Sequence, residues 1–113
     1  MRSIVAVERQ ESYEPEEIGQ KLWQMLAAIK AFDRLKGKRV LIKPNCTGAY
    51  SPEEGRTTHP VVLEQLVEIL GKAEVTIGES SSVGVDTSAA YEKTGVKAAA
   101  ENLGVRLVDF KKS

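Results

Sequence analysis

The sequence predicts an α/β fold, namely a doubly wound parallel sheet of about four strands (β-α-β-α-β-α-β) with helices on both faces. Four short apolar runs begin at positions 3, 39, 74 and 105, which are 36, 35 and 31 residues apart, and helical patterns lie between them. A βαβ unit needs about 30 residues, so each interval has room for one crossover helix. At 113 residues the chain is expected to form a single domain, residues 1–113.

The four expected strands are rich in Val, Ile and Leu, the residue types that pack well in sheets. They are Ser3–Val7, Arg39–Lys43, Glu74–Ile77 and Val105–Phe110. The middle two are almost continuously apolar, which is typical of strands covered on both faces of a parallel sheet.

The first interval predicts a helix that begins at Pro15, a favoured first helical residue, among acidic side chains that suit the positive end of the helix dipole. Six apolar residues then recur at helical spacing: Ile18, Leu22, Met25, Leu26, Ile29 and Phe32. Gly37 stands where a C-terminal cap is expected.

The other two intervals predict shorter helices. One begins at Pro60, carries Leu63, Leu66, Val67 and Leu70 on its inner face, and stops at Gly71. The last interval starts at a cap formed by Asp86 or Thr87 and is interrupted at Thr94-Gly95. It resumes over residues 97–103 and ends at Gly104, so two short helices and one kinked helix both fit.

Composition excludes several classes of protein. Sixteen basic residues balance sixteen acidic ones, so the chain lacks the basic surplus of proteins that bind nucleic acids or anionic membranes. The N-terminal apolar run is too short for a secretory signal or a membrane span. A single cysteine, Cys46, provides neither a disulfide nor the four thiolates of an iron–sulfur cluster. We therefore expect a cytoplasmic protein that holds no metal and no cofactor of its own.

Two polar clusters follow expected strands, at the sheet edge where open α/β proteins bind ligands. Lys43 and Asn45 follow the second strand, and Glu79 and Ser80 follow the third. Thr57, Thr58 and His59 precede the helix at Pro60, whose N-terminal N–H groups attract anions. These seven residues are the candidate site for a small anionic ligand. The structural alternative is that Lys43 ends a strand in water and Thr58 or His59 caps the helix.

His59 and Cys46 allow further interpretations. His59, the single histidine, could act as an acid or base in a free-standing enzyme with Lys43, or could cap the helix before Pro60. Cys46 could be a nucleophile or a small buried residue. The serine-rich turn Gly78–Gly84 lacks the spacing of known phosphate loops, and it leaves open a flavodoxin-like module that binds a nucleotide or flavin.

Several segments occur in one order along the chain and together resemble a known family. They are Val40-Leu-Ile-Lys-Pro-Asn45, Glu54-Gly-Arg-Thr-Thr-His-Pro60, Val75-Thr-Ile-Gly-Glu-Ser80, Tyr91-Glu-Lys-Thr-Gly95 and Gly104-Val-Arg-Leu-Val-Asp109. The chain resembles the N-terminal part of the domain of unknown function 362 family, with Ile-Lys-Pro-Asn and Thr-Thr-His-Pro as the most specific segments. Lys43, Asn45, Thr57, His59, Glu79 and Ser80 are the polar positions within these segments.

The resemblance implies a domain that continues past residue 113 and an association with iron–sulfur or ferredoxin-like proteins. This chain lacks the ferredoxin-type cysteines of many members. The resemblance itself implies little chemistry. Taken with the polar residues at the strand ends, it leads us to expect an uncharacterised domain that binds an anionic small molecule or serves a redox assembly with a partner protein, and it leaves open whether the chain is an enzyme. Open sheet edges and zero net charge also predict a homo-oligomer, built on an edge strand or on an uncovered sheet face.

Overall fold

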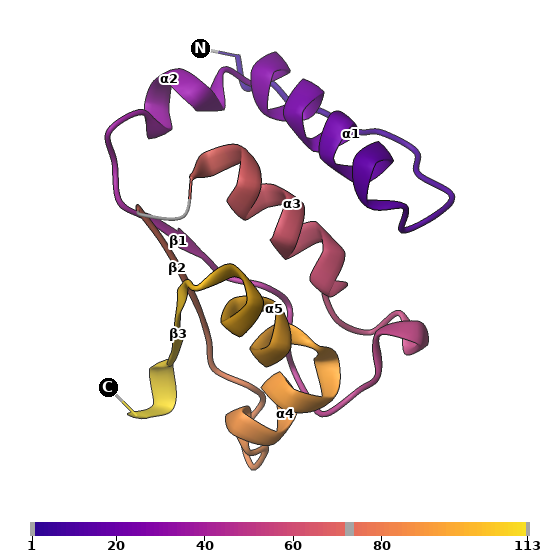
Figure 1. The fold of residues 1–113 in the computed structure, drawn as a ribbon, viewed down its shortest axis with the longest axis vertical. Coiled ribbons are helices and arrows are strands. Elements are labelled where there is room, and N and C mark those ends of the chain that lie inside the picture. Colours follow the sequence, from indigo (N-terminus) through magenta and orange to yellow (C-terminus); the bar gives the residue numbers. More distant parts are fainter. Residues whose placement is uncertain (1, 72–73, 113) are drawn as a thin grey trace.

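A computed structural model describes residues 2–71 and 74–112 of the chain. Helices and strands alternate over most of its length (Figure 1). In chain order the elements are α1 (Pro15–Ala28), α2 (Ala31–Leu35), β1 (Val40–Ile42), η1 (Pro52–Glu54), α3 (Pro60–Leu70), β2 (Val75–Glu79), α4 (Thr87–Thr94), α5 (Val96–Leu103), β3 (Arg106–Asp109) and η3 (Phe110–Lys112).

The sheet is parallel, as predicted, and its three strands lie in the order β1-β2-β3. Ile42 pairs with Ile77, and Ile77 pairs with Leu107, so all three strands end at the same edge. The predicted strands at positions 39, 74 and 105 are thus confirmed, within a residue or two of their expected bounds.

The prediction of a fourth strand at Ser3–Val7 is wrong. The segment contains no strand residue and lies beside the apolar side of α1, near Leu22, Met25, Leu26 and Ile29. Its β-branched residues satisfy the local preference for an extended chain. A strand also needs a neighbour that accepts its hydrogen bonds, and the segment lies on the helical layer instead of the sheet.

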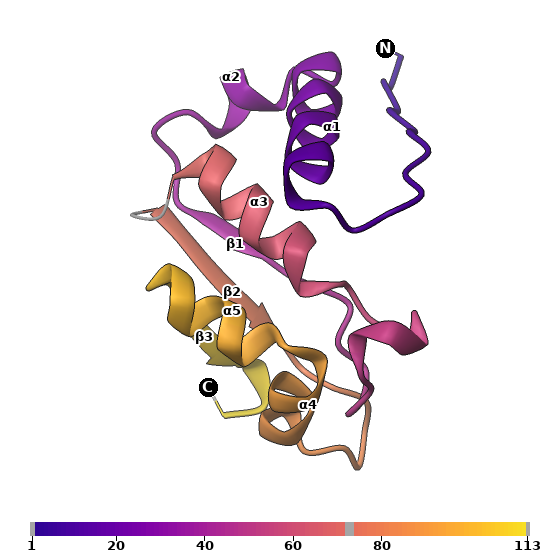
Figure 2. The same ribbon diagram turned by 45° about the vertical axis from the view of Figure 1, so that its right-hand side comes forward.

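The helices form layers on one side of the sheet, whereas the sequence predicted helices on both faces. Figures 1 and 2 show α3 and α5 beside the sheet and α1 beyond α3. Right-handed crossovers between strands that are neighbours in sequence and in space place both crossover helices on one face. On the opposite face Leu41 remains 54% exposed.

The core lies between the sheet and the layer of α3 and α5. It is built from aliphatic residues of both, including Ile42, Leu63, Val67, Ile77 and Val96, and the last four are at most 1% exposed. The inner-face pattern predicted for α3 is therefore confirmed. None of the helices in residues 2–71 and 74–112 is long and apolar enough to cross a membrane.

The first predicted helix divides in two. Lys30 adopts a left-handed conformation (φ 60°) between α1 and α2, although the apolar spacing continues to Phe32. Arg34 stabilises the chain at this break, since its Nη2 donates to the carbonyl oxygen of Ile29 at 2.6 Å. The spacing alone could not reveal this break, because the apolar residues of α2 continue the pattern of α1.

The third crossover forms two short helices, one of the two arrangements that the sequence allowed. Asp86 caps α4 by accepting a hydrogen bond from the Ser88 N–H at 3.1 Å. Gly95 separates α4 from α5 with φ 85°, and a Cβ atom there would lie 2.8 Å from the Pro60 ring. Glycine is thus required both by the backbone conformation and by the close approach of α3.

Candidate functional site

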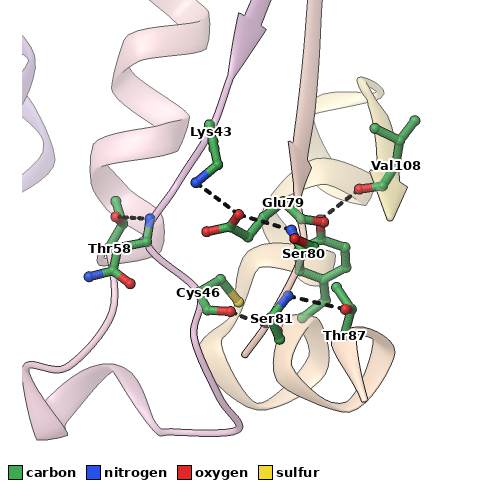
Figure 3. A network of polar contacts seen from close by, with 10 residues as sticks. Lys43, Cys46, Thr58, Glu79, Ser80, Ser81, Thr87 and Val108 are labelled. Carbon is green, nitrogen blue, oxygen red and sulfur yellow. Dashed lines mark hydrogen bonds and ion pairs between the residues drawn. The ribbon is translucent and has the colours of Figure 1, made fainter. Parts of the chain in front are cut away.

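The carboxyl edge of the sheet brings together the loops that follow β1 and β2, as Figure 3 shows. The Ser82 N–H donates to the Thr47 carbonyl at 3.1 Å, and the buried Ser81 hydroxyl donates to the Cys46 carbonyl at 2.7 Å. Thr87 at the start of α4 accepts from the Ser81 N–H at 3.2 Å. These hydrogen bonds hold the two loops beside each other beyond the strand ends.

Lys43 and Glu79 form an ion pair at this edge, with Nζ 3.0 Å from Oε1. The Glu79 side chain is only 6% exposed, whereas that of Lys43 is 62% exposed. The Ser80 N–H donates to the same carboxylate oxygen at 2.9 Å. A buried carboxylate requires such partners, because removing its charge from water is costly.

Asn45 and Thr58 join the two ends of the long connection between β1 and α3. The Asn45 N–H donates to the Thr58 hydroxyl at 2.8 Å, and the Thr58 N–H donates to the Asn45 carbonyl at 2.9 Å. The chain therefore returns to the end of β1 just before α3 begins (Figure 3). The Asn45 side chain is exposed, so its amide group remains available to a ligand.

His59 is the N-terminal cap of α3, which is the structural alternative considered for it above. Its Nδ1 accepts the Val61 N–H at 3.2 Å, and its ring stacks on Tyr13 with centroids 3.9 Å apart. The Val62 N–H also donates to the His59 carbonyl, at 3.0 Å. Since the protein itself occupies these N–H groups, α3 offers an anion fewer free donors than its sequence suggested.

Thr57 carries a buried hydroxyl with no hydrogen-bond partner among the described residues. It lies next to Thr58 in the segment that returns to the end of β1. Buried polar atoms in native proteins nearly always have a partner, so a hydroxyl of this kind calls for one beyond those that residues 2–71 and 74–112 provide.

Cys46 and Tyr91 are buried, and their polar atoms contact other groups of the protein. Cys46 is fully buried, with its sulfur 3.6 Å from the Thr94 hydroxyl, and burial raises the pKa of the thiol. Such a thiol is a poor nucleophile, because the thiolate is the reactive form. The Tyr91 hydroxyl lies 2.6 Å from the Val108 carbonyl oxygen and 3.1 Å from that of Glu79. Burial raises the pKa of Tyr91 to about 12.

Lys111 is a site residue that sequence reasoning did not find. Its Nζ donates to the carbonyl oxygens of Ser82 and Val85, at 2.9 and 2.7 Å, and so holds the loop that follows β2. The two contacts span 29 and 26 residues, and the sequence carries no signal for them. Of the predicted residues, the structure joins Lys43 with Glu79 and Ser80, and Asn45 with Thr58, whereas His59 and Thr57 take part in neither group.

The described residues contain no group of three or more His, Cys, Asp or Glu side chains that could hold a metal ion. A family model described as "Domain of unknown function (DUF362)" matches residues 40–113, from β1 onward. Neither the curated proteins nor the solved structures contain a match to the chain. The match covers more than half of the sequence, and the chain belongs to the DUF362 family, in agreement with the resemblance of its motifs.

Proposed function

We propose that this member of the DUF362 family binds a small anionic molecule at the carboxyl edge of its sheet, with the Lys43 ammonium as the principal contact. The observation that carries this proposal is the unequal exposure of the Lys43–Glu79 pair. The buried carboxylate fixes the direction of the lysine side chain, while most of that side chain faces solvent. A lysine held in this way loses less conformational entropy when it binds a ligand than a free surface lysine does.

Neighbouring polar groups support the same site. Asn45 and Ser80 are exposed residues that follow Lys43 and Glu79 closely in the chain, and the side chains of both can donate hydrogen bonds to an oxyanion. The unpartnered Thr57 hydroxyl lies in the adjoining segment and would gain a partner from a bound ligand or from the water around it. Ligands of open α/β sheets bind beyond the carboxyl ends of the strands, where these groups lie.

The charge of the site limits the class of ligand. Glu79 neutralises much of the Lys43 charge, so the pair alone does not favour a highly charged molecule. A small carboxylate or a single phosphate group fits one ammonium and a few neutral donors better than a polyphosphate does. A role in an iron–sulfur assembly would need thiolates from a partner, because the one cysteine of the chain is buried.

Phosphate titration of ¹⁵N-labelled protein tests the proposal. We expect inorganic phosphate to shift the amide signals of Asn45 and Ser80 with a dissociation constant of roughly 1 mM, and Lys43→Ala to weaken binding about tenfold. Lys97→Ala is the matched control, because Lys97 forms an exposed ion pair with Glu92 on the helical layer. Equal losses in the two variants would show that phosphate responds to net charge alone and would refute the site.

A further inference from the structure

We infer that the Ser3–Val7 segment of one chain adds to the free edge of β3 in a second copy of this chain, as a fourth, parallel strand. Exchange of this contact in both directions would close a homodimer. The inference is independent of the proposed anion site, which lies at the carboxyl edge of the sheet and involves neither element.

The segment has the properties of a strand that lacks a sheet. Residues 3–8 make no backbone-to-backbone hydrogen bond within the described part of the chain. Val5 and Val7 are 80% and 84% exposed, whereas Ile4 is 53% exposed and Ala6 is partly buried. Ile4 and Ala6 are thus more covered than the two valines, which present most of their side chains to solvent together with the free N–H and C=O groups of the segment.

The outer edge of β3 has the complementary properties. Among the described residues, β3 pairs with β2 alone, so its other edge is free of a neighbouring strand. Beside this edge lies a hollow of about 410 Å³ against α4 and α5, with Ala100, Val105 and Leu107 among its apolar residues. The same hollow is lined by three acidic residues and one lysine: Glu92, Glu101, Asp109 and Lys97. Lys97 already pairs with Glu92, so the net charge of this surface is negative.

One register between the N-terminal segment and β3 matches apolar residues with apolar residues and a basic residue with an acidic one. If Val7 lies beside Leu107 in a parallel pair, Val5 lies beside Val105 and Arg9 lies beside Asp109. The exposed valines then cover the apolar part of the hollow, and Arg9 meets its acidic rim. Arg9 is available for this contact, because its present ion pair with Glu11 is exposed on both sides and therefore weak.

Charge favours β3 over the opposite edge of the sheet. Two hollows border β1. Among the described residues, one is lined by Lys38 and Arg39 without an acidic residue, and in the other Asp33 and Glu74 are balanced by Lys36 and Lys38. A segment that ends at Arg9 would be repelled there and attracted to the acidic rim beside β3.

Light scattering after size-exclusion chromatography gives the first test. We expect the mass of the wild-type chain to rise from 12.3 kDa toward twice that value between micromolar and near-millimolar concentration. Arg9→Glu should weaken dimerisation about tenfold. Arg2→Glu changes the net charge equally, but residue 2 precedes the residues that this register places beside β3, so this control should retain the dimer. A constant mass of 12.3 kDa, or equal effects of the two substitutions, would overturn the inference.

Disulfide formation tests the register and identifies the partner. Glu8→Cys with Val108→Cys should yield a covalent dimer, because paired residues of adjacent strands lie within disulfide range. Val7→Cys with Val108→Cys should not, because residue 7 then faces the opposite side of the sheet. Cys46 is fully buried in both variants and does not compete. A disulfide within one chain, or equal yields from the two pairs, would contradict the proposed exchange between copies.

Discussion

At the carboxyl edge of the sheet, hydrogen bonds join loops that are distant in sequence, whereas the N-terminal layer rests on α3 largely through apolar side chains. Ser81 and Ser82 bind the loop that follows β1, and Lys111 reaches back across the edge to the loop that follows β2. In α1, Ile18 is the one buried residue described, and the stacking of Tyr13 on His59 adds a further contact.

The family match divides the molecule along the same line. It begins at residue 40, so it includes the hydrogen-bonded edge and excludes both α1 and the segment before it. A network of directed hydrogen bonds fixes side chains in place, as a binding site requires. A layer held by non-directional apolar contacts leaves its outer surface free for association. The proposed anion site lies in the first region, and the segment that we propose to add to a second copy lies in the second.

The largest expected effect comes from Tyr91 at high pH. Its pKa in the folded chain is about 12, above the ordinary value of about 10, so the unfolded chain releases the proton first as pH rises. The stability contributed by the neutral hydroxyl is complete below pH 10 and should fall by about 2 kcal/mol by pH 12. Urea unfolding of wild type and Tyr91→Phe over this range should show the loss in the wild type alone.

Tyr13→Phe serves as the control for that experiment, because Tyr13 is 55% exposed in the N-terminal layer. Its stability should follow the wild-type curve throughout. If Tyr91→Phe lost stability in parallel with the wild type, the hydroxyl at the end of β3 would contribute nothing to the pH dependence. The contrast between the two regions would then fail at a buried residue of the hydrogen-bonded edge.

Substitution of one serine in each region compares their contributions to stability at neutral pH. Ser81→Ala removes a buried hydrogen bond to the Cys46 carbonyl and leaves that acceptor without this donor, so we expect a loss of about 1–2 kcal/mol in the free energy of unfolding. Ser12→Ala removes an exposed hydrogen bond to Glu17 of 2.9 Å and should cost less than about 0.5 kcal/mol. Chemical denaturation measures both, and equal losses would refute the difference.

The sequence predicted the fold of residues 40–113, which match the family model, better than that of the N-terminal region. For β1, β2 and α3, local preference and tertiary burial agree, because each apolar run contributes residues to the core, although Leu41 of β1 faces the uncovered side of the sheet. At Ser3–Val7 the local preference for an extended chain is real, but pairing depends on which edge the segment reaches. The one-sided layering likewise depends on the strand order, which no local pattern encodes.

The candidate site was predictable only in outline. That Lys43 and Glu79 meet follows from the ends of two adjacent parallel strands. The hydrogen bonds of Asn45 with Thr58 depend on the path of a long loop, and those of Lys111 depend on where the chain turns after β3. Sequence spacing carries no information about these approaches, because turns of many shapes are compatible with the same residues.

Two helix caps provide the smallest and most closely matched comparison, since each is a carboxylate that accepts one backbone N–H. Asp86 accepts from Ser88 at 3.1 Å beside the hydrogen-bonded edge, and Glu14 accepts from Glu17 at 2.8 Å in the N-terminal layer. Asp86→Ala should lower global stability by about 1 kcal/mol, and Asp86→Asn should restore it, because asparagine caps equally well. Glu14→Ala should cost only a few tenths of that and should speed hydrogen exchange in α1 alone, because α1 opens without the sheet. A loss of protection that spreads from α1 to β2 would mean that the N-terminal layer and the sheet unfold as one unit, and that the division between the two regions has no energetic basis.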